Sequence, residues 1–173
     1  LSISKSLVEM MGGTLALASA PGEGSVFSFT LTLPLDVDVP AGAACVPLTS
    51  MQALLVDSHD VHRRVMHDSL QAWGVEVRIA EDAAAALAAL RNPTGPACNT
   101  VLVNHAAAPT ETEAMVRRLR DGDAYGAPIV VLMTAAGGIK IAGSLQATGE
   151  VAGFVTKPVR PSQLYSVLAG AWA

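Results

Sequence analysis

The sequence predicts an α/β fold: a doubly wound, parallel five-stranded sheet covered by helices on both faces, preceded by a smaller helix-plus-hairpin unit. Residues 51–173 repeat a short apolar run followed by a helical stretch five times, with turn residues bounding each run. Parallel strands joined by helices are buried on both faces, which suits such near-continuous apolar runs. Residues 1–35 lack this repeat and carry a different pattern.

The first segment predicts one helix and one β-hairpin. Residues 2–11 place their apolar side chains at helical spacing, and Gly12-Gly13 follow where a left-handed helix stop belongs. A strand over 14–18, a turn over 21–24 and a strand over 25–33 complete the unit. A helix and a hairpin cannot make a domain alone. Residues 36–50 have no periodicity and are rich in Pro, Ala and Gly, which indicates a linker.

The third segment, residues 51–173, gives five predicted strands and five predicted helices. The strands are predicted over 53–56, 75–79, 100–103, 129–133 and 153–156. The helices are predicted over 61–73, 83–90, 112–119, 139–146 and 162–172. On the first of these helices we expect the apolar stripe to face the core: Val61, Val65, Leu70 and Trp73.

Charge and composition exclude several classes of function. The net charge is -4 without a basic cluster, so duplex DNA is not an expected partner. The longest run of large apolar residues, 129–133, is far shorter than the roughly 20 residues that cross a bilayer, and we expect no membrane contact. Cys45 and Cys98 lack metal-binding spacing and predict reduced thiols in the cytoplasm.

Polar residues stand where the predicted strands end. In parallel sheets, ligands and chemistry gather at the carboxyl ends of the strands. These ends carry Asp57 and Ser58 after the first strand, Asn104 after the third, Thr134 after the fourth and Lys157 after the fifth.

This arrangement resembles the receiver domain of response regulators over essentially all of residues 51–173. Receivers carry an acidic pair after strand one, a phosphorylated Asp after strand three, a Thr or Ser after strand four and a Lys-Pro after strand five. The stretch 154–164 is very similar to the end of receivers in hybrid histidine kinases. The resemblance implies a flavodoxin-like fold and a role in two-component phosphorelay signalling.

The first 35 residues resemble the end of the ATP-binding catalytic domain of histidine kinases. Residues 1–5 match the stretch after its last glycine-rich box, and residues 21–29 match its closing hairpin. A kinase end followed by a receiver is the order of a hybrid sensor histidine kinase. The resemblance implies that the ATP-binding residues lie upstream, so we expect no enzymatic activity from this fragment, while the parent protein is an ATP-dependent protein-histidine kinase.

The departures from the receiver pattern predict a pseudo-receiver. The acidic pair is reduced to Asp57 and Ser58, and Asn104 holds the acceptor position; counting back from Pro109 would place His105 there instead. Neither register supplies an Asp, and an amide cannot form the acyl phosphate. We expect no cofactor, and at most weak Mg²⁺ binding at Asp57. His105 is expected to be a hydrogen-bonding loop residue.

The remaining receiver positions are expected to be structural. With no acceptor present, Lys157 and Thr134 are expected to pair with Asp57 and Asn104. Pro158 is expected to follow a cis peptide bond. Asp60 is expected to be a helix N-cap rather than a substitute acceptor.

Two functions follow from the resemblance. The first is docking on the catalytic and dimerisation domains of the same kinase, or on a further receiver, through the face of the fourth helix, fifth strand and fifth helix. The second is sensing of cyclic di-GMP on the same face, because guanine recognition uses Arg and planar groups. The residues expected to serve docking or sensing are Lys140, Phe154, Pro158, Arg160, Gln163 and Tyr165.

Overall fold

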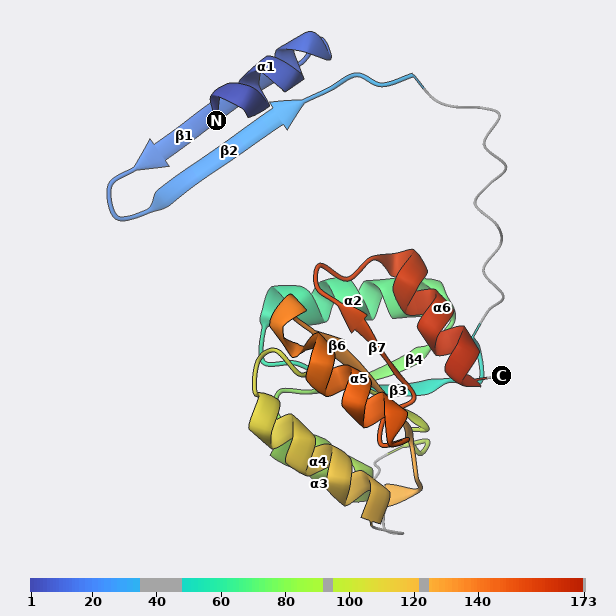
Figure 1. Cartoon of the computed structure of the whole chain (residues 1–173). Helices are drawn as coiled ribbons and strands as arrows, with labels where there is room; N and C mark the ends of the chain where they lie inside the picture. The colour runs from blue at the N-terminus through green and yellow to red at the C-terminus, as the bar shows by residue number, and fades with distance from the viewer. Residues whose placement is uncertain (35–47, 92–94, 122–124, 173) are drawn as a thin grey trace. The chain divides into compact units, whose positions relative to one another are not determined.

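The structure is a computed structural model that describes residues 1–34, 48–91, 95–121 and 125–172 (Figure 1). The chain divides into two compact units, residues 1–44 and 45–173. Most of the predicted linker, 36–50, lies outside the described residues. Its last residues belong to the second unit, because Leu48 is buried and its N–H donates to the Trp73 carbonyl at 2.8 Å.

The first unit consists of α1 (Ser2–Met10), β1 (Thr14–Ala20) and β2 (Gly24–Thr30), as predicted, although β2 ends three residues early. The two strands pair antiparallel, from Thr14 opposite Thr30 to Ala20 opposite Gly24. Gly12 has a φ of 76°, which suits the helix stop predicted there. Large apolar side chains of this unit are exposed: Leu1, Ile3, Leu7, Met10, Met11, Leu17, Val26, Phe27, Phe29 and Leu33.

The second unit is the predicted parallel sheet. Its strands are β3 (Gln52–Val56), β4 (Glu76–Ala80), β5 (Thr100–Asn104), β6 (Ile129–Thr134) and β7 (Gly153–Thr156). They lie in the order β4-β3-β5-β6-β7, and every neighbouring pair is parallel. The helices are α2 (Asp60–Ala72), α3 (Ala83–Arg91), α4 (Pro109–Asp121), the short 3₁₀ turn η2 (Ala136–Gly138), α5 (Ile139–Ala147) and α6 (Pro161–Trp172). This is a flavodoxin-like fold.

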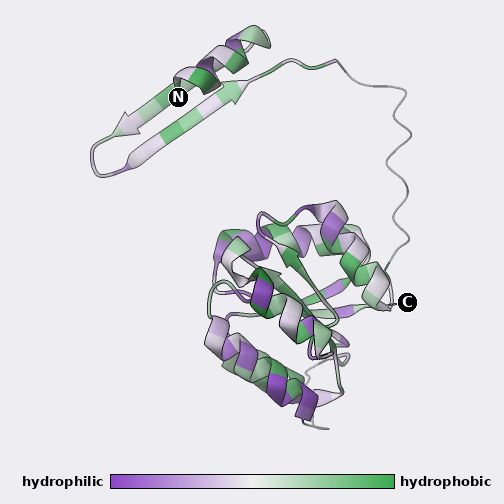
Figure 2. Ribbon diagram, viewed as in Figure 1, coloured by the Kyte–Doolittle hydropathy of each residue, from purple (hydrophilic) through white to green (hydrophobic). Residues whose placement is uncertain are grey.

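Helices cover both faces of the sheet because neighbouring residues of a strand point to opposite sides. One core cluster joins strand residues such as Val101 and Leu132 to Met115 of α4. The other joins Leu102 and Val131 to helices α2 and α6. In Figure 2 the strands of this sheet are mainly green, the colour of hydrophobic residues, and the purple of hydrophilic residues appears on the surrounding helices. Among the described residues, no helix is long and apolar enough to cross a membrane.

The predicted core stripe of α2 is wrong in half of its members. Val61 and Val65 are 65% and 52% exposed, whereas Met66 and Leu70 are buried. Successive helix residues are rotated by about 100°, so Val61 and Val65 form a stripe beside the one that faces the sheet. Two parallel stripes with the same spacing cannot be told apart from the sequence of the helix, because the position of the sheet decides which one is buried.

Candidate functional site

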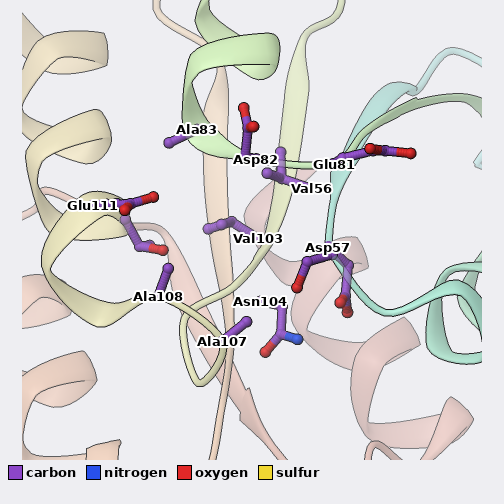
Figure 3. Close-up of a pocket in the computed structure, with 12 residues that line it drawn as sticks. Val56, Asp57, Glu81, Asp82, Ala83, Val103, Asn104, Ala107, Ala108 and Glu111 are labelled. Atoms are coloured by element: carbon purple, nitrogen blue, oxygen red, sulfur yellow. The ribbon is translucent and has the colours of Figure 1, made fainter.

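The candidate site lies where β3 and β5 end side by side. The chain passes from β3 to the edge strand β4 and then returns across β3 to β5, so the strand order reverses between β3 and β5. Open parallel sheets bind ligands at such a reversal, beyond the carboxyl ends of the strands. Val56 is opposite Val103 in this pair, which puts the next residues, Asp57 and Asn104, at the shared edge (Figure 3).

Asp57 is 2% exposed and is held through both its backbone and its carboxylate. Its Oδ1 accepts a hydrogen bond from the His59 N–H at 2.9 Å, and its Oδ2 contacts Nδ1 of His62. Its backbone carbonyl accepts from Nη1 of Arg63 at 2.8 Å. Burial by itself raises the pKa of Asp57, but hydrogen bonds from Asn104, His59 and His62 outweigh it and leave the pKa below its ordinary value.

Asn104 is buried and hydrogen-bonds to the Asp57 carboxylate. Because a carboxylate only accepts hydrogen bonds, the amide nitrogen of Asn104 is the donor, leaving Oδ1 for another partner. Oδ1 has no hydrogen-bond partner among the residues that the structure describes. The position beside Asp57 is therefore held by an amide, and not by His105.

His105 is a buried turn residue directly after β5, and the prediction of a hydrogen-bonding loop residue is confirmed. Its ring Nδ1 lies 3.3 Å from Oγ1 of Thr134, and its Nε2 lies 3.6 Å from a carboxylate oxygen of Glu113. The ring therefore reaches toward the end of β6 and α4, whereas Asn104 lies beside Asp57. The expected pairing of Thr134 with Asp57 and Asn104 is wrong, since its hydroxyl contacts His105 and the Ala135 carbonyl.

Lys157 lies at the end of β7 and is half-buried. Its N–H donates to the Thr134 carbonyl at 2.8 Å, and the predicted cis bond between Lys157 and Pro158 is confirmed. Burial lowers the pKa of the Lys157 amine, and the nearby Asp57 carboxylate only partly offsets this effect. Among the described residues, no ion pair or hydrogen bond joins the Lys157 amine to Asp57, so only the electrostatic influence of the expected pairing is present.

Two cavities adjoin the site. The first has a volume of about 140 Å³ and carries four carboxylates on its wall, Asp57, Glu81, Asp82 and Glu111 (Figure 3). The second is wider, about 410 Å³. It is lined by Ser58, His59, His62, Asn104, Ala106, Ala107 and Lys157.

The donor set does not fit Mg²⁺. Magnesium needs near-octahedral coordination by oxygens and is usually held by carboxylates. Both oxygens of Asp57 already have partners, His59 and His62, and positions 58 and 104 supply an uncharged hydroxyl and an amide. Within the described ranges, no group of three or more His, Cys, Asp or Glu side chains is arranged to hold a metal ion.

Sequence reasoning missed His62 and Arg63 as parts of the site. Both lie in the first two turns of α2, which begins at Asp60, shortly after β3 ends at Val56. Arg63 reaches the Asp57 carbonyl, pairs with Asp60 and lies 3.6 Å from Glu81. Asp60 is therefore the first helical residue and not the N-cap, which is His59. The sequence did contain a signal for Arg63: it forms a pair of opposite charges with Asp60, three residues earlier at the start of the helix.

The residues expected to serve docking or sensing divide between two packing environments. Phe154 packs against the core cluster of α3, α4 and α5. Tyr165 packs against the opposite cluster, with its ring edge-on to Trp73 at 5.4 Å and 71°. Lys140, Pro158, Arg160 and Gln163 are exposed.

Comparison with known proteins agrees with this architecture. No protein-family model matches the chain. Three curated relatives are sensor proteins, one of them named as a sensor histidine kinase. The virulence sensor protein BvgS of Bordetella bronchiseptica is 37% identical over 97 residues, covering 51% of this chain and 8% of that protein. The sensor histidine kinase AruS of Pseudomonas aeruginosa is 34% identical over 91 residues, 53% of this chain and 9% of that protein. The sensor protein GacS of Pseudomonas syringae is 32% identical over 76 residues, 44% of this chain and 8% of that protein.

Solved structures show the receiver fold. A response regulator receiver domain protein from Clostridium thermocellum matches with a TM-score of 0.61 and 16% identity, covering 70% of this chain and 93% of that one. The chemotaxis response regulator CheY4 of Vibrio cholerae matches with a TM-score of 0.59 and 21% identity, covering 70% and 98%. At these identities the likeness establishes the fold alone.

The fold and the relatives together define a receiver-like domain of two-component signalling. The particular relatives are the sensor proteins BvgS and GacS and the sensor histidine kinase AruS, and the chain spans less than a tenth of their length.

Proposed function

We propose that residues 51–173 are a pseudo-receiver: a regulatory and docking domain of a hybrid histidine kinase that does not accept a phosphoryl group. The observation that carries the proposal is Asn104, which lies beside Asp57 and donates a hydrogen bond to it. In this position a phosphoryl acceptor must attack phosphorus with a free carboxylate oxygen. The amide oxygen of Asn104 is a poor nucleophile, and its nitrogen is engaged.

The charge of the site supports the same proposal. Three carboxylates at positions 57, 58 and 104 would carry a charge of about -3 and would bind Mg²⁺ strongly, whereas Asp57 alone carries about -1. The phosphoryl-transfer transition state needs that metal to neutralise its equatorial oxygens. We therefore expect the site to lack both the nucleophile and the metal.

A labelling experiment tests the loss of phosphotransfer. The intact chain is incubated with Mg²⁺ and a small phosphoryl donor such as acetyl phosphate, and acyl phosphate is read by intact mass and by its lability to hydroxylamine. We expect no label on the native sequence. The matched control is the double variant Ser58→Asp, Asn104→Asp, which restores both carboxylates and is expected to gain label. Label on the native sequence would overturn the proposal.

The proposed docking surface is the α5–β7–α6 face. Two apolar side chains of α5 are exposed, Ile139 at 40% and Ile141 at 43%, and they flank the exposed Lys140. Arg160 and Gln163 are exposed at the start of α6. Small apolar patches with a charged rim are typical of protein–protein contacts. The proposed partners are the catalytic and dimerisation domains of the same protein, or a further receiver, in the cytoplasm.

Glutamate substitutions on this face, made in the full-length kinase, test the proposed docking surface. We expect Arg160→Glu and Ile141→Glu to change the autophosphorylation rate of the kinase core severalfold in the same direction. The matched control is Arg64→Glu, an exposed arginine on α2. A change with the Arg64 variant alone would place the docking surface on α2 and refute the α5–β7–α6 assignment.

The first unit is proposed to be the end of a kinase catalytic domain. Its helix buries only Val8, and both faces of its hairpin carry exposed apolar side chains. A segment of this kind needs further chain to cover it. We expect this fragment neither to bind ATP nor to catalyse phosphorylation, because the resemblance places the ATP-binding residues upstream.

Binding of cyclic di-GMP remains the alternative proposal. Arg160, Lys140 and Gln163 are exposed and free to reach a ligand, but Phe154 and Tyr165 pack against opposite core clusters, which disfavours a shared stacking platform. A ligand that binds only the folded state must raise the melting temperature. A rise with cyclic di-GMP that Arg160→Ala abolishes would support sensing, and no rise at near-millimolar ligand would refute it.

A further inference from the structure

His105 is a buried imidazole that the proposed docking function does not use. It is 2% exposed and follows directly after β5, yet its ring reaches two other elements. Nδ1 lies 3.3 Å from the Thr134 hydroxyl at the end of β6, and Nε2 lies 3.6 Å from Glu113 on α4. A single ring therefore joins the ends of β5 and β6 to α4.

The groups around the His105 ring assign the donor. Nε2 lies 3.6 Å from the Glu113 carboxylate, which can only accept, so the ring hydrogen belongs on Nε2. Nδ1 then accepts from the Thr134 hydroxyl at 3.3 Å. The same hydroxyl lies 3.3 Å from the Ala135 carbonyl, and Nε2 has no partner within hydrogen-bond distance among the described residues.

The space above this pair is closed by the turn into α5. A side-chain carbon at Gly138 would lie 2.2 Å from the Thr134 hydroxyl and 3.3 Å from Nδ1 of His105. The backbone of η2 therefore rests directly on the hydrogen-bonded pair. Gly138 is followed at once by Ile139, Lys140 and Ile141, the exposed residues at the start of α5.

We propose that His105 is an internal latch: its ring holds the Thr134 hydroxyl inward, and through it fixes η2 and the start of α5 against α4 in one arrangement. The inference rests on the proposed function in one respect, since it takes the site to receive no phosphoryl group that would compete for Thr134. The start of α5 is then presented in a constant position, set by a buried side chain of the chain itself.

Nuclear magnetic resonance on the intact chain tests the donor assignment. Long-range proton–nitrogen correlations distinguish the protonation of the two ring nitrogens, and His105→Gln identifies the His105 signals among the four histidines. We expect a hydrogen on Nε2 and an unprotonated Nδ1 whose nitrogen signal shifts in Thr134→Val. A hydrogen on Nδ1, or an Nδ1 signal that Thr134→Val leaves unchanged, would overturn the latch.

Hydrogen exchange tests the mechanical consequence. In His105→Gln and in Thr134→Val we expect the amides of 136–141 to exchange about tenfold faster. This is the effect expected when local opening of the segment no longer has to break one buried hydrogen bond. The double variant is expected to exchange no faster than the faster single variant, because both changes break the same contact. The control is His67→Ala, whose ring lies 3.3 Å from Asp68 on its own helix.

Exchange in 136–141 that rises no more than in His67→Ala, or effects of the two variants that simply multiply, would refute the latch. These readouts are independent of phosphorylation. A chain that takes label from acetyl phosphate but shows the expected ring signals would refute the pseudo-receiver and retain the His105–Thr134 contact. An unlabelled chain whose variants leave the exchange of 136–141 unchanged would refute the latch and retain the pseudo-receiver.

Discussion

Nδ1 of His62 contacts Oδ2 of Asp57, so the one carboxylate left among positions 57, 58 and 104 is already bound by a side chain of the same chain. His62 lies in the first turn of α2, five residues after Asp57, and the helix turns its ring back over the strand end. The neighbouring Oδ1 accepts the His59 N–H at 2.9 Å. The carboxylate that would serve a cation in a receiver is thus used for internal hydrogen bonding.

We expect His62→Ala to lower stability near neutral pH by about 0.5–1.5 kcal/mol, the usual contribution of one hydrogen bond. His62 helps to lower the pKa of Asp57, so its removal moves that pKa back toward its ordinary value. An acid with a lowered pKa contributes stability above its unfolded pKa and loses it as pH falls through the folded pKa.

Chemical denaturation from pH 3 to pH 7 measures this effect. The difference between the native protein and His62→Ala should be largest above about pH 5 and should shrink in acid, as the linkage relation requires. His67→Ala, which removes a ring paired with the exposed Asp68, is the control and should change stability little. A difference that stays constant down to pH 3 would show that Asp57 is not the partner.

Asn104→Asp should destabilise the fold by about 2–4 kcal/mol at neutral pH, because it replaces a donor to Asp57 with a second buried negative charge. Repulsion raises the pKa of the new carboxyl, so the lost stability should return as pH falls and the group becomes neutral. Thermal unfolding at several pH values measures it. Gln71→Glu adds the same charge at an exposed position on α2 and should change stability by much less.

Gly138→Ala should cost about 1–3 kcal/mol, because a Cβ there would lie 2.2 Å from the Thr134 hydroxyl and the loop would have to move. Gly137→Ala is a matched control one residue away, since its Cβ would meet nothing within 4 Å. Denaturant titration of both variants gives the comparison. Equal losses would mean that the contact above Thr134 is looser than the structure indicates.

Lys157→Met should raise stability at neutral pH, because burial of the amine lowers its pKa and its charged form therefore carries a cost in the folded state. A base whose pKa is lowered by folding binds fewer protons when folded, so native stability rises with pH in the alkaline range below the ordinary value of 10.5. Lys157→Met should abolish that rise, and the exposed control Lys140→Met should retain it. Loss of stability in Lys157→Met would mean that the attraction to Asp57 outweighs burial.

Much of the fold could be predicted because its signals are local. Alternating apolar runs and helical spacing are set by neighbouring residues, and all five strands and five helices of the second unit were predicted within a few residues. Ends were less accurate: α4 begins at Pro109 rather than 112, and β2 stops at Thr30 rather than 33. Strand and helix ends depend on pairing and packing partners that a local pattern does not contain.

The candidate site, too, could be predicted from the sequence only in part. The absence of a carboxylate at positions 58, 104 and 105 follows directly from the amino-acid sequence, and it is the strongest argument against phosphotransfer. The choice between Asn104 and His105 was open, because counting residues around an inserted alanine gives two registers. Strand pairing resolves it: Val56 lies opposite Val103, so Asn104 follows beside Asp57.

The sequence by itself determined the order of the elements, the parallel sheet and the chemical identity of each strand end. Only the tertiary structure decided which side chains meet there. His105 and Thr134 are 29 residues apart in the chain and meet because β5 and β6 pair in register. The burial of Met66 in place of Val65 likewise depends on where the sheet lies beneath α2. Contacts of this kind are fixed by long-range packing, and no local spacing encodes them.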